Sequence, residues 1–218
     1  MNFIYFMDPS DFYSLILPLP KILSGQIYAG CVNPAAASYR SLIVEYTKRI
    51  GEELARQGVV GHFAVDYLAK KTPTDDTEKW NVTGIEINLR QGGTTHSYST
   101  MAALCGGHTG SDGVFRTKAG KERYYEATDS YIDHRLAGLK SSVFLTKHLS
   151  SSDPTVVNLR WNHREKMGVV FHLLSLLEIG EIGFTAIGET SGQANKLFEE
   201  TTRMLNAIAE TLQMDTPK

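Results

Sequence analysis

The spacing of apolar residues predicts a chain of mixed α+β structure that contains two long helices. Between residues 36 and 57, apolar side chains recur every three or four positions, at Leu42, Ile43, Tyr46, Ile50 and Leu54. Gly58 is suited to end this helix. The same spacing returns near the C-terminus, at Ala194, Leu197, Phe198, Thr201, Leu205, Ile208 and Leu212. Thr190 or Ser191 is the expected N-cap of that last helix.

A β-hairpin is predicted between these helices. Residues 59–69 form a strand pattern that is largely apolar on both sides, with Asp66 as the exception. A second strand follows, in which Ile85, Ile87 and Leu89 alternate with Glu86, Asn88 and Arg90. The polar residues 70–81 lie between the two strands, so a hairpin with a long loop is the simplest connection.

Shorter patterns cover the remaining segments. Residues 22–32 predict a strand, and a short helix is expected after residue 97, ended by the glycines at 106 and 107. A second hairpin is expected around Gly120, followed by a loop. The apolar runs 167–177 and 183–187 suit a buried strand, or a helix followed by a strand.

Three parts of the chain are distinguished by these patterns. Residues 1–21 are apolar and aromatic, but Asp8 and Pro9 interrupt them, so we expect neither a signal peptide nor a spanning helix. We interpret this segment as the remnant of a larger domain. A turn-rich break at 150–154 then separates a predicted catalytic subdomain at 22–150 from a strand–helix subdomain at 151–218.

Composition narrows the functional classes. The 218 residues are 42% hydrophobic and 21% charged, with a net charge of −2, which is ordinary for a globular protein and argues against a general nucleic-acid binder. Neither a nucleic-acid partner nor a membrane is expected. The two cysteines, Cys31 and Cys105, are too few for a disulfide framework or a metal cluster, which favours a reducing, cytoplasmic location.

Three oxygen-bearing residues of the predicted hairpin form a candidate magnesium site. Glu86 and Asn88 lie two residues apart on one strand and so share a face, and Asp66 lies on the neighbouring strand. Magnesium prefers such hard oxygen donors and usually retains water and phosphate oxygens as further ligands. Two carboxylates this close would also repel each other without a cation.

The residues that follow suggest an anion site beside the metal. Arg90 is one step further along the same face and can bind phosphate oxygens with two donors, although pairing with Glu86 or another acid is the simpler alternative. The glycine turn Gly92-Gly93-Thr94-Thr95 can supply backbone N–H groups to the same anion, or it is only a turn.

These motifs resemble ATP-grasp ligases. The pattern of a strand aspartate followed by E-I-N on the next strand is similar to the metal-binding pattern of that superfamily. The longer strings I-E-I-N-L-R-Q-G-G-T-T-H at 85–96, G-V-V-G-H-F-A-V-D at 58–66 and R-Y-Y-E-A-T-D at 123–129 are most like pheganomycin-type peptide ligases and related carboxylate–amine ligases. Together with Y-A-G-C-V-N-P-A at 28–35, they extend the resemblance over nearly the whole chain from residue 22.

The resemblance implies an ATP-grasp C-terminal subdomain, with a mainly antiparallel central sheet flanked by helices. It implies ATP and Mg²⁺ as cofactors, and carboxylate and amine substrates that are small molecules or peptides and are joined through an acyl phosphate. The lysine pair and glycine-rich flap of the N-terminal lid subdomain are not seen before residue 22, so a missing N-terminal half or partner chain is expected, without which the isolated chain is expected to be inactive. The alternative is a non-catalytic or truncated ATP-grasp-like module that binds a nucleotide or a protein.

The histidines are weaker candidates. His62 and His96 lie near the predicted site, but forming an acyl phosphate does not require a protein base, so we interpret them as structural. His172 lies in an apolar run and is predicted to be a hydrogen-bonded core residue.

Overall fold

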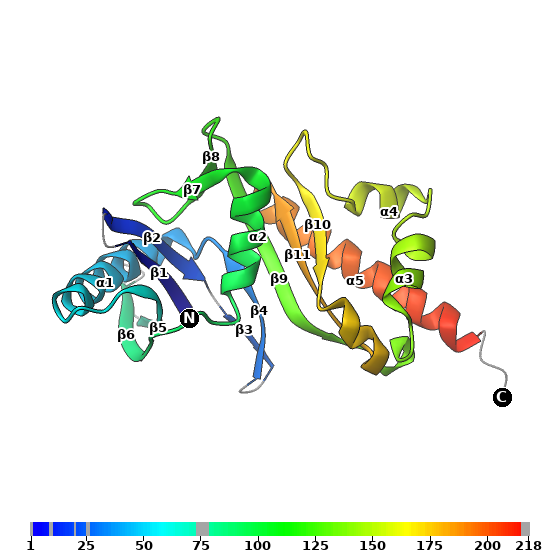
Figure 1. The fold of residues 1–218 in the computed structure, drawn as a ribbon, viewed down its shortest axis with the longest axis horizontal. Coiled ribbons are helices and arrows are strands. Elements are labelled where there is room, and N and C mark those ends of the chain that lie inside the picture. Colours follow the sequence, from blue (N-terminus) through cyan, green and yellow to red (C-terminus); the bar gives the residue numbers. More distant parts are fainter. Residues whose placement is uncertain (1, 9–10, 20, 25–26, 73–78, 215–218) are drawn as a thin grey trace. The chain divides into compact units, whose positions relative to one another are not determined.

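The computed structural model describes residues 2–8, 11–19, 21–24, 27–72 and 79–214, and their side chains from residue 30 onward except at Thr72. The chain forms two compact units (Figure 1). The first contains residues 1–22 and 31–123, and the second contains residues 23–30 and 124–218. This boundary differs from the predicted division near residue 150, because the strand that begins at Glu122 continues into the second unit and pairs there.

An antiparallel sheet of order β2-β1-β5-β6 organises the first unit. Its strands are β1 (Asn2–Asp8), β2 (Asp11–Leu19), β5 (Gly61–Thr72) and β6 (Lys79–Asn88). The predicted hairpin is confirmed as β5 and β6, although both strands extend into the polar segment that was expected to be loop. The N-terminal segment, interpreted from sequence as a remnant, supplies two strands of this sheet.

Helix α1 (Ala37–Arg56) confirms the first predicted helix and packs on one face of this sheet. Tyr39 and Ile43 contact a core that includes Phe63 and Val65 of β5. Because alternate residues of a strand face opposite sides, the apolar set of β5 is directed to the helix while Asp66 lies on the other face. The helix thereby determines which face of β5 and β6 remains for chemistry.

Helix α2 (Thr95–Cys105) follows the glycine turn and ends at Gly106, whose φ of 66° suits glycine. The strands β7 (Gly107–Thr109) and β8 (Phe115–Thr117) come next, and β8 pairs with the first residues of β9 (Glu122–Ile132). The predicted hairpin around Gly120 is therefore confirmed. The loop predicted after it is wrong, because β9 continues to Ile132 and pairs with β11 (Glu181–Gly188).

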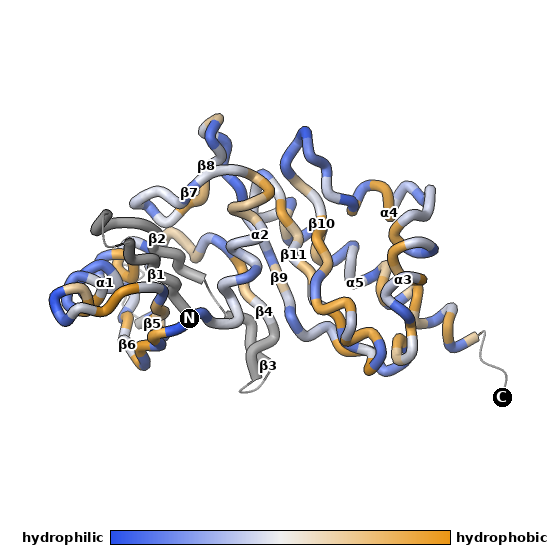
Figure 2. Tube along the Cα trace, in the orientation of Figure 1, coloured by the Kyte–Doolittle hydropathy of each residue, from blue (hydrophilic) through white to orange (hydrophobic). Residues whose placement is uncertain are grey.

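The second unit is built on strands in the order β10-β11-β9-β4-β3. β10 (Gly168–His172), β11 and β9 are antiparallel, and β4 (Ile27–Asn33) and β3 (Lys21–Ser24) extend the order. β10 and the η3 segment (Leu174–Ile179) after it are among the more hydrophobic stretches of the chain (Figure 2).

Helix α5 (Ser191–Met214) packs against β11 and confirms the last predicted helix. The hydroxyl of Thr190 accepts a hydrogen bond from the amide of Gln193 at 3.1 Å, which confirms the predicted cap. The predicted stripe is buried at Ala194, Leu197, Thr201, Leu205 and Ile208. Four short elements complete the unit: η1 (His134–Leu136), α3 (Ser141–Val143), the π-helical turn η2 (Phe144–His148) and α4 (Pro154–Leu159).

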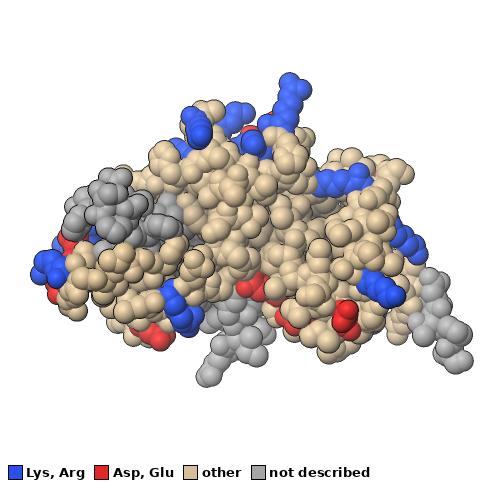
Figure 3. All heavy atoms as spheres, in the orientation of Figure 1, with Lys and Arg blue, Asp and Glu red and all other residues tan. Residues whose placement is uncertain are grey.

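Charged side chains of both signs are present on the surface. On the face shown in Figure 3, lysine and arginine side chains are most numerous along the upper edge, and most of the visible acidic side chains lie along the lower edge. Cys31 and Cys105 are buried and form no disulfide. A search of the described residues finds no helix with the length and hydrophobicity needed to cross a membrane.

Candidate metal and phosphate site

The β5–β6 register brings the three predicted metal ligands together. Asp66 is paired with Glu86, and Asn88 is paired with Ala64, two residues before Asp66. Directly opposite residues of an antiparallel pair lie on the same face, as do residues two apart. Asp66, Glu86 and Asn88 therefore share one face of the first unit's sheet. A register shift follows immediately after Asp66, and regular pairing resumes at Tyr67 and Gly84.

The accessibility of these side chains suits a ligand site. Glu86 is exposed, while Asp66 and Asn88 are half-buried. Within the described residues, the side chains of Glu86 and Asn88 make no hydrogen bond or ion pair, so their oxygens are available. Two carboxylates and one amide oxygen form a hard-oxygen donor set that fits Mg²⁺. Whether an ion binds there remains a prediction.

Arg90 does not pair with an acidic side chain of the described residues, which was the simpler alternative that the sequence offered. Its guanidinium is exposed, and its Nη1 donates a hydrogen bond to the carbonyl of Gln91 at 3.3 Å. In the described part of the chain, Arg90 forms no ion pair with Glu86 or any other acid. Most of its five N–H donors thus remain available to an anion.

The glycine turn is only partly available for anion binding. The amide of Gly92 donates to the Thr95 hydroxyl at 3.0 Å, and the amide of Thr95 donates to the Gly92 carbonyl at 3.0 Å. The expectation that Gly92 supplies an N–H group to a phosphate is therefore not met in this structure, because that donor stabilises the turn itself. Gly93 and Thr94 remain the candidate donors.

The turn leads directly into the N-terminus of α2. Thr94 occupies the N-cap position but its side chain makes no capping hydrogen bond. Thr94 is completely buried, and its Oγ1 has no hydrogen-bond partner among the described residues. The first N–H groups of a helix lack intrahelical partners and favour a nearby anion. The sequence predicted a short helix after residue 97, and α2 begins slightly earlier, at Thr95, directly after the turn.

The apolar residues that alternate with the ligands are unexpectedly exposed. Ile85, Ile87 and Leu89 are 64%, 46% and 57% accessible. β6 is an edge strand of the four-stranded sheet, so these side chains lie where α1 no longer covers the sheet. The alternation predicted the strand and its register, but it did not predict which apolar residues would be buried.

The histidines occupy varied environments. His172 on β10 contacts Asp129 on β9, with Nε2 3.4 Å from Oδ1, so it is a partnered residue at the edge of the core rather than a fully buried one. Sequence reasoning missed Asp129, which was quoted only as the end of the R-Y-Y-E-A-T-D string. Burial lowers the pKa of His62, and the His96 ring lies 3.2 Å from the Ser97 hydroxyl.

Comparison with known proteins supports the resemblance. No protein-family model matches the chain. The L-propargylglycine–L-glutamate ligase of Streptantibioticus cattleyicolor is 28% identical over 176 residues, which are 80% of this chain and 34% of the ligase. The chain thus spans about a third of that relative's length.

Two solved structures share the fold. The ADP complex of purK, an N5-carboxyaminoimidazole ribonucleotide synthetase, matches with a TM-score of 0.51 at 13% identity, over 94% of this chain and 48% of the other. The ATPase subunit of phosphoribosylaminoimidazole carboxylase from Aquifex aeolicus matches with a TM-score of 0.53 at 14% identity, over 94% and 55%. The solved structures therefore confirm the predicted α+β fold, and the similarity to a curated ligase agrees with the resemblance that the motifs predicted.

Proposed function

We propose that this chain is the C-terminal module of an ATP- and Mg²⁺-dependent ligase that joins a carboxylate to an amine. The observation that supports this most directly is the placement of Asp66 opposite Glu86, with Asn88 on the same face. The substrates in this proposal are small molecules or peptides, as the ligase in the comparison suggests by its name. The proposed location is the cytoplasm, in line with two buried cysteines that form no disulfide.

The proposed chemistry has two steps. The substrate carboxylate attacks the γ-phosphorus of ATP and ADP leaves, which forms an acyl phosphate. The amine then attacks the acyl carbon, the C–N bond forms, and inorganic phosphate leaves as the C–O bond breaks. Bound magnesium would supply charge neutralisation at the phosphates.

This chain's residues would position those groups. Asp66, Glu86 and Asn88 are the ligands that would hold the metal. Negative charge is concentrated on the oxygens of the transferred phosphoryl group. Arg90 would bind these oxygens with its exposed guanidinium. The backbone of Gly93 and Thr94, at the N-terminus of α2, would bind a further phosphate oxygen.

Calorimetric titration of the chain with ATP, with and without Mg²⁺, tests this proposal. We expect binding that requires Mg²⁺, and we expect Glu86→Gln and Asp66→Asn to lose this Mg²⁺-dependent binding. Glu199→Gln, which removes an exposed carboxylate on α5, is the matched control and should bind as the wild type does. Absence of binding at millimolar ATP would instead favour the non-catalytic interaction module.

Paramagnetic broadening by Mn²⁺ separates metal binding from nucleotide binding. Added alone, Mn²⁺ should broaden the amide signals near Asp66 and Glu86 in the wild type and leave those of Glu86→Gln sharp. Uniform broadening, or broadening confined to other acidic residues, would refute the assigned ligands even if ATP binds.

A further inference from the structure

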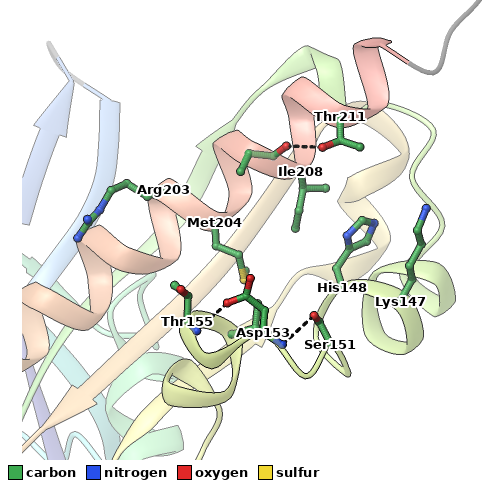
Figure 4. A pocket seen from close by; sticks show the side chains of 11 residues that line it. Lys147, His148, Ser151, Asp153, Thr155, Arg203, Met204, Ile208 and Thr211 are labelled. Carbon is green, nitrogen blue, oxygen red and sulfur yellow. Dashed lines mark hydrogen bonds between the residues drawn. The ribbon is translucent and has the colours of Figure 1, made fainter.

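A cavity lies within the second unit of the chain. None of its lining residues belongs to the metal and phosphate site proposed above. Its volume is about 490 Å³, within the range of small-molecule sites. Four elements enclose it: η2, the turn that follows it, α4 and the C-terminal half of α5 (Figure 4). Its lining combines an apolar floor with charged and hydroxyl groups at the rim.

The floor can bury a hydrocarbon group. Val156 of α4 and Met204 and Ile208 of α5 line it, and each is at most 8% exposed in the structure. Covering such a surface with an apolar ligand would remove both surfaces from water, which stabilises the complex. A ligand that occupies this cavity is therefore expected to have an apolar body.

The rim has an excess of positive charge. Lys147 and Arg203 are exposed and lie on opposite sides of the cavity in Figure 4. Asp153 is the only acid among the described residues of the lining, and its Oδ1 already accepts a hydrogen bond from the amide of Thr155 at 2.8 Å, as the cap of α4. Two cations against one engaged carboxylate favour an anionic ligand.

His148 adds a polar group to the interior of the cavity. Its ring is directed toward α5 in Figure 4, and its Nε2 is buried without a hydrogen-bond partner among the described residues. Burial, with a smaller effect from Lys147, lowers the pKa of His148 and so favours the neutral imidazole. A buried polar atom without a partner destabilises the protein, and a rotation of the ring that lets a ligand oxygen accept Nε2–H would relieve this.

The turn beside His148 is held in place before any ligand arrives. Arg160 donates from Nε to the carbonyl of Leu149 at 2.6 Å and from Nη2 to the carbonyl of Ser151. The hydroxyl of Ser151 accepts from the amide of Asp153 at 3.2 Å. Because these hydrogen bonds already order the turn, a ligand that contacts it would lose less conformational entropy on binding.

We propose that this cavity binds a small organic carboxylate with an apolar tail. The tail would lie on Met204, Ile208 and Val156, and the carboxylate would bind one of the rim cations and, after the ring turns toward the cavity, Nε2–H of His148. The proposal does not depend on the ligase activity, since it concerns other residues and another unit of the chain.

Two-dimensional NMR of the full chain with 4-phenylbutyrate as the probe tests the proposal. We expect a Kd of about 1 mM for a probe of this size, with shifts confined to residues of η2, α4 and α5. The uncharged analogue 4-phenylbutanol and the cation 4-phenylbutylammonium should bind more weakly. Equal binding of the three probes, or shifts in other parts of the chain, would overturn the proposal.

Two variants assign the polar contacts. His148→Phe keeps an aromatic ring near Phe144, whose centroid is 6.4 Å away, and should weaken 4-phenylbutyrate about fivefold through loss of one buried hydrogen bond. Arg203→Gln should weaken it about threefold, and high salt should reduce that difference. Arg164→Gln removes a cation that is 93% exposed and outside the cavity, and should change nothing. Unchanged affinity in His148→Phe and Arg203→Gln would contradict the proposed carboxylate contacts.

Discussion

Asp66 and Glu86 occupy directly opposite positions on β5 and β6, so that two carboxylates share one face of an antiparallel pair. Like charges in such positions destabilise a sheet. Part of the sheet's stability is therefore expected to depend on a cation between them.

Replacing Glu86 with Gln tests this dependence. In magnesium-free buffer, the free energy of unfolding should rise by about 0.5 kcal/mol because the repulsion is removed. Added Mg²⁺ should stabilise the wild type and have little effect on the variant. Urea denaturation at several Mg²⁺ concentrations measures both effects. If Glu199→Gln behaves in the same way, the effect is one of net charge and not of a site.

The approach of His172 to Gly183 leads to a second prediction. A Cβ at residue 183 would lie 2.3 Å from Cδ2 and Nε2 of His172, so Gly183→Ala must displace the imidazole from Asp129. We expect a loss of about 1–2 kcal/mol of stability and altered His172 ring signals in NMR spectra. Gly192→Ala, where a Cβ meets nothing within 4 Å, should be neutral or slightly stabilising. An unshifted His172 signal in Gly183→Ala would contradict this geometry.

The hydrogen bond that joins α1 to β5 is open to a double-mutant cycle. Thr47 donates from its hydroxyl to the Tyr67 hydroxyl at 3.1 Å, and both residues are buried. Tyr67→Phe should lower the free energy of unfolding by about 1 kcal/mol, because it leaves the Thr47 hydroxyl without this partner. In a Thr47→Val background the same change should cost less. Additive effects in thermal or urea denaturation would show that this bond contributes no coupling energy.

Tyr98 gives a prediction for alkaline pH. Burial raises the pKa of Tyr98 to about 12, compared with a usual value of 10. Since the unfolded chain releases this proton near pH 10 and the folded chain does not, stability from this group is complete below pH 10 and is lost as the pH rises toward 12. By pH 11 the loss should be about 1 kcal/mol.

Tyr98→Phe should remove that part of the alkaline destabilisation. Urea denaturation from pH 8 to 11 is the measurement, with the wild type in parallel. Burial also raises the pKa of Tyr39 and Tyr67, so a smaller slope should remain in the variant. Superimposable pH profiles for the two proteins would rule out the assigned role of Tyr98.

Local periodicity was sufficient to predict the two long helices, the β5–β6 hairpin and part of the candidate site. The two long helices follow from apolar spacing of three and four residues, and the hairpin follows from alternation on either side of a polar segment, because both signals depend only on neighbouring side chains. Asp66, Glu86 and Asn88 could be proposed as one group because strand alternation assigns faces without further information.

Features that depend on pairing between distant segments were decided only by the tertiary structure. The opposition of Asp66 to Glu86 depends on the β5–β6 register, and the length of β9 depends on β11, which lies some fifty residues later. The amide of Gly92 is engaged because the chain turns back onto Thr95. His148 and the residues of α5 that line the same cavity are far apart in the sequence and come together only in the folded second unit. Local periodicity therefore could not predict the cavity or the burial of the His148 nitrogen.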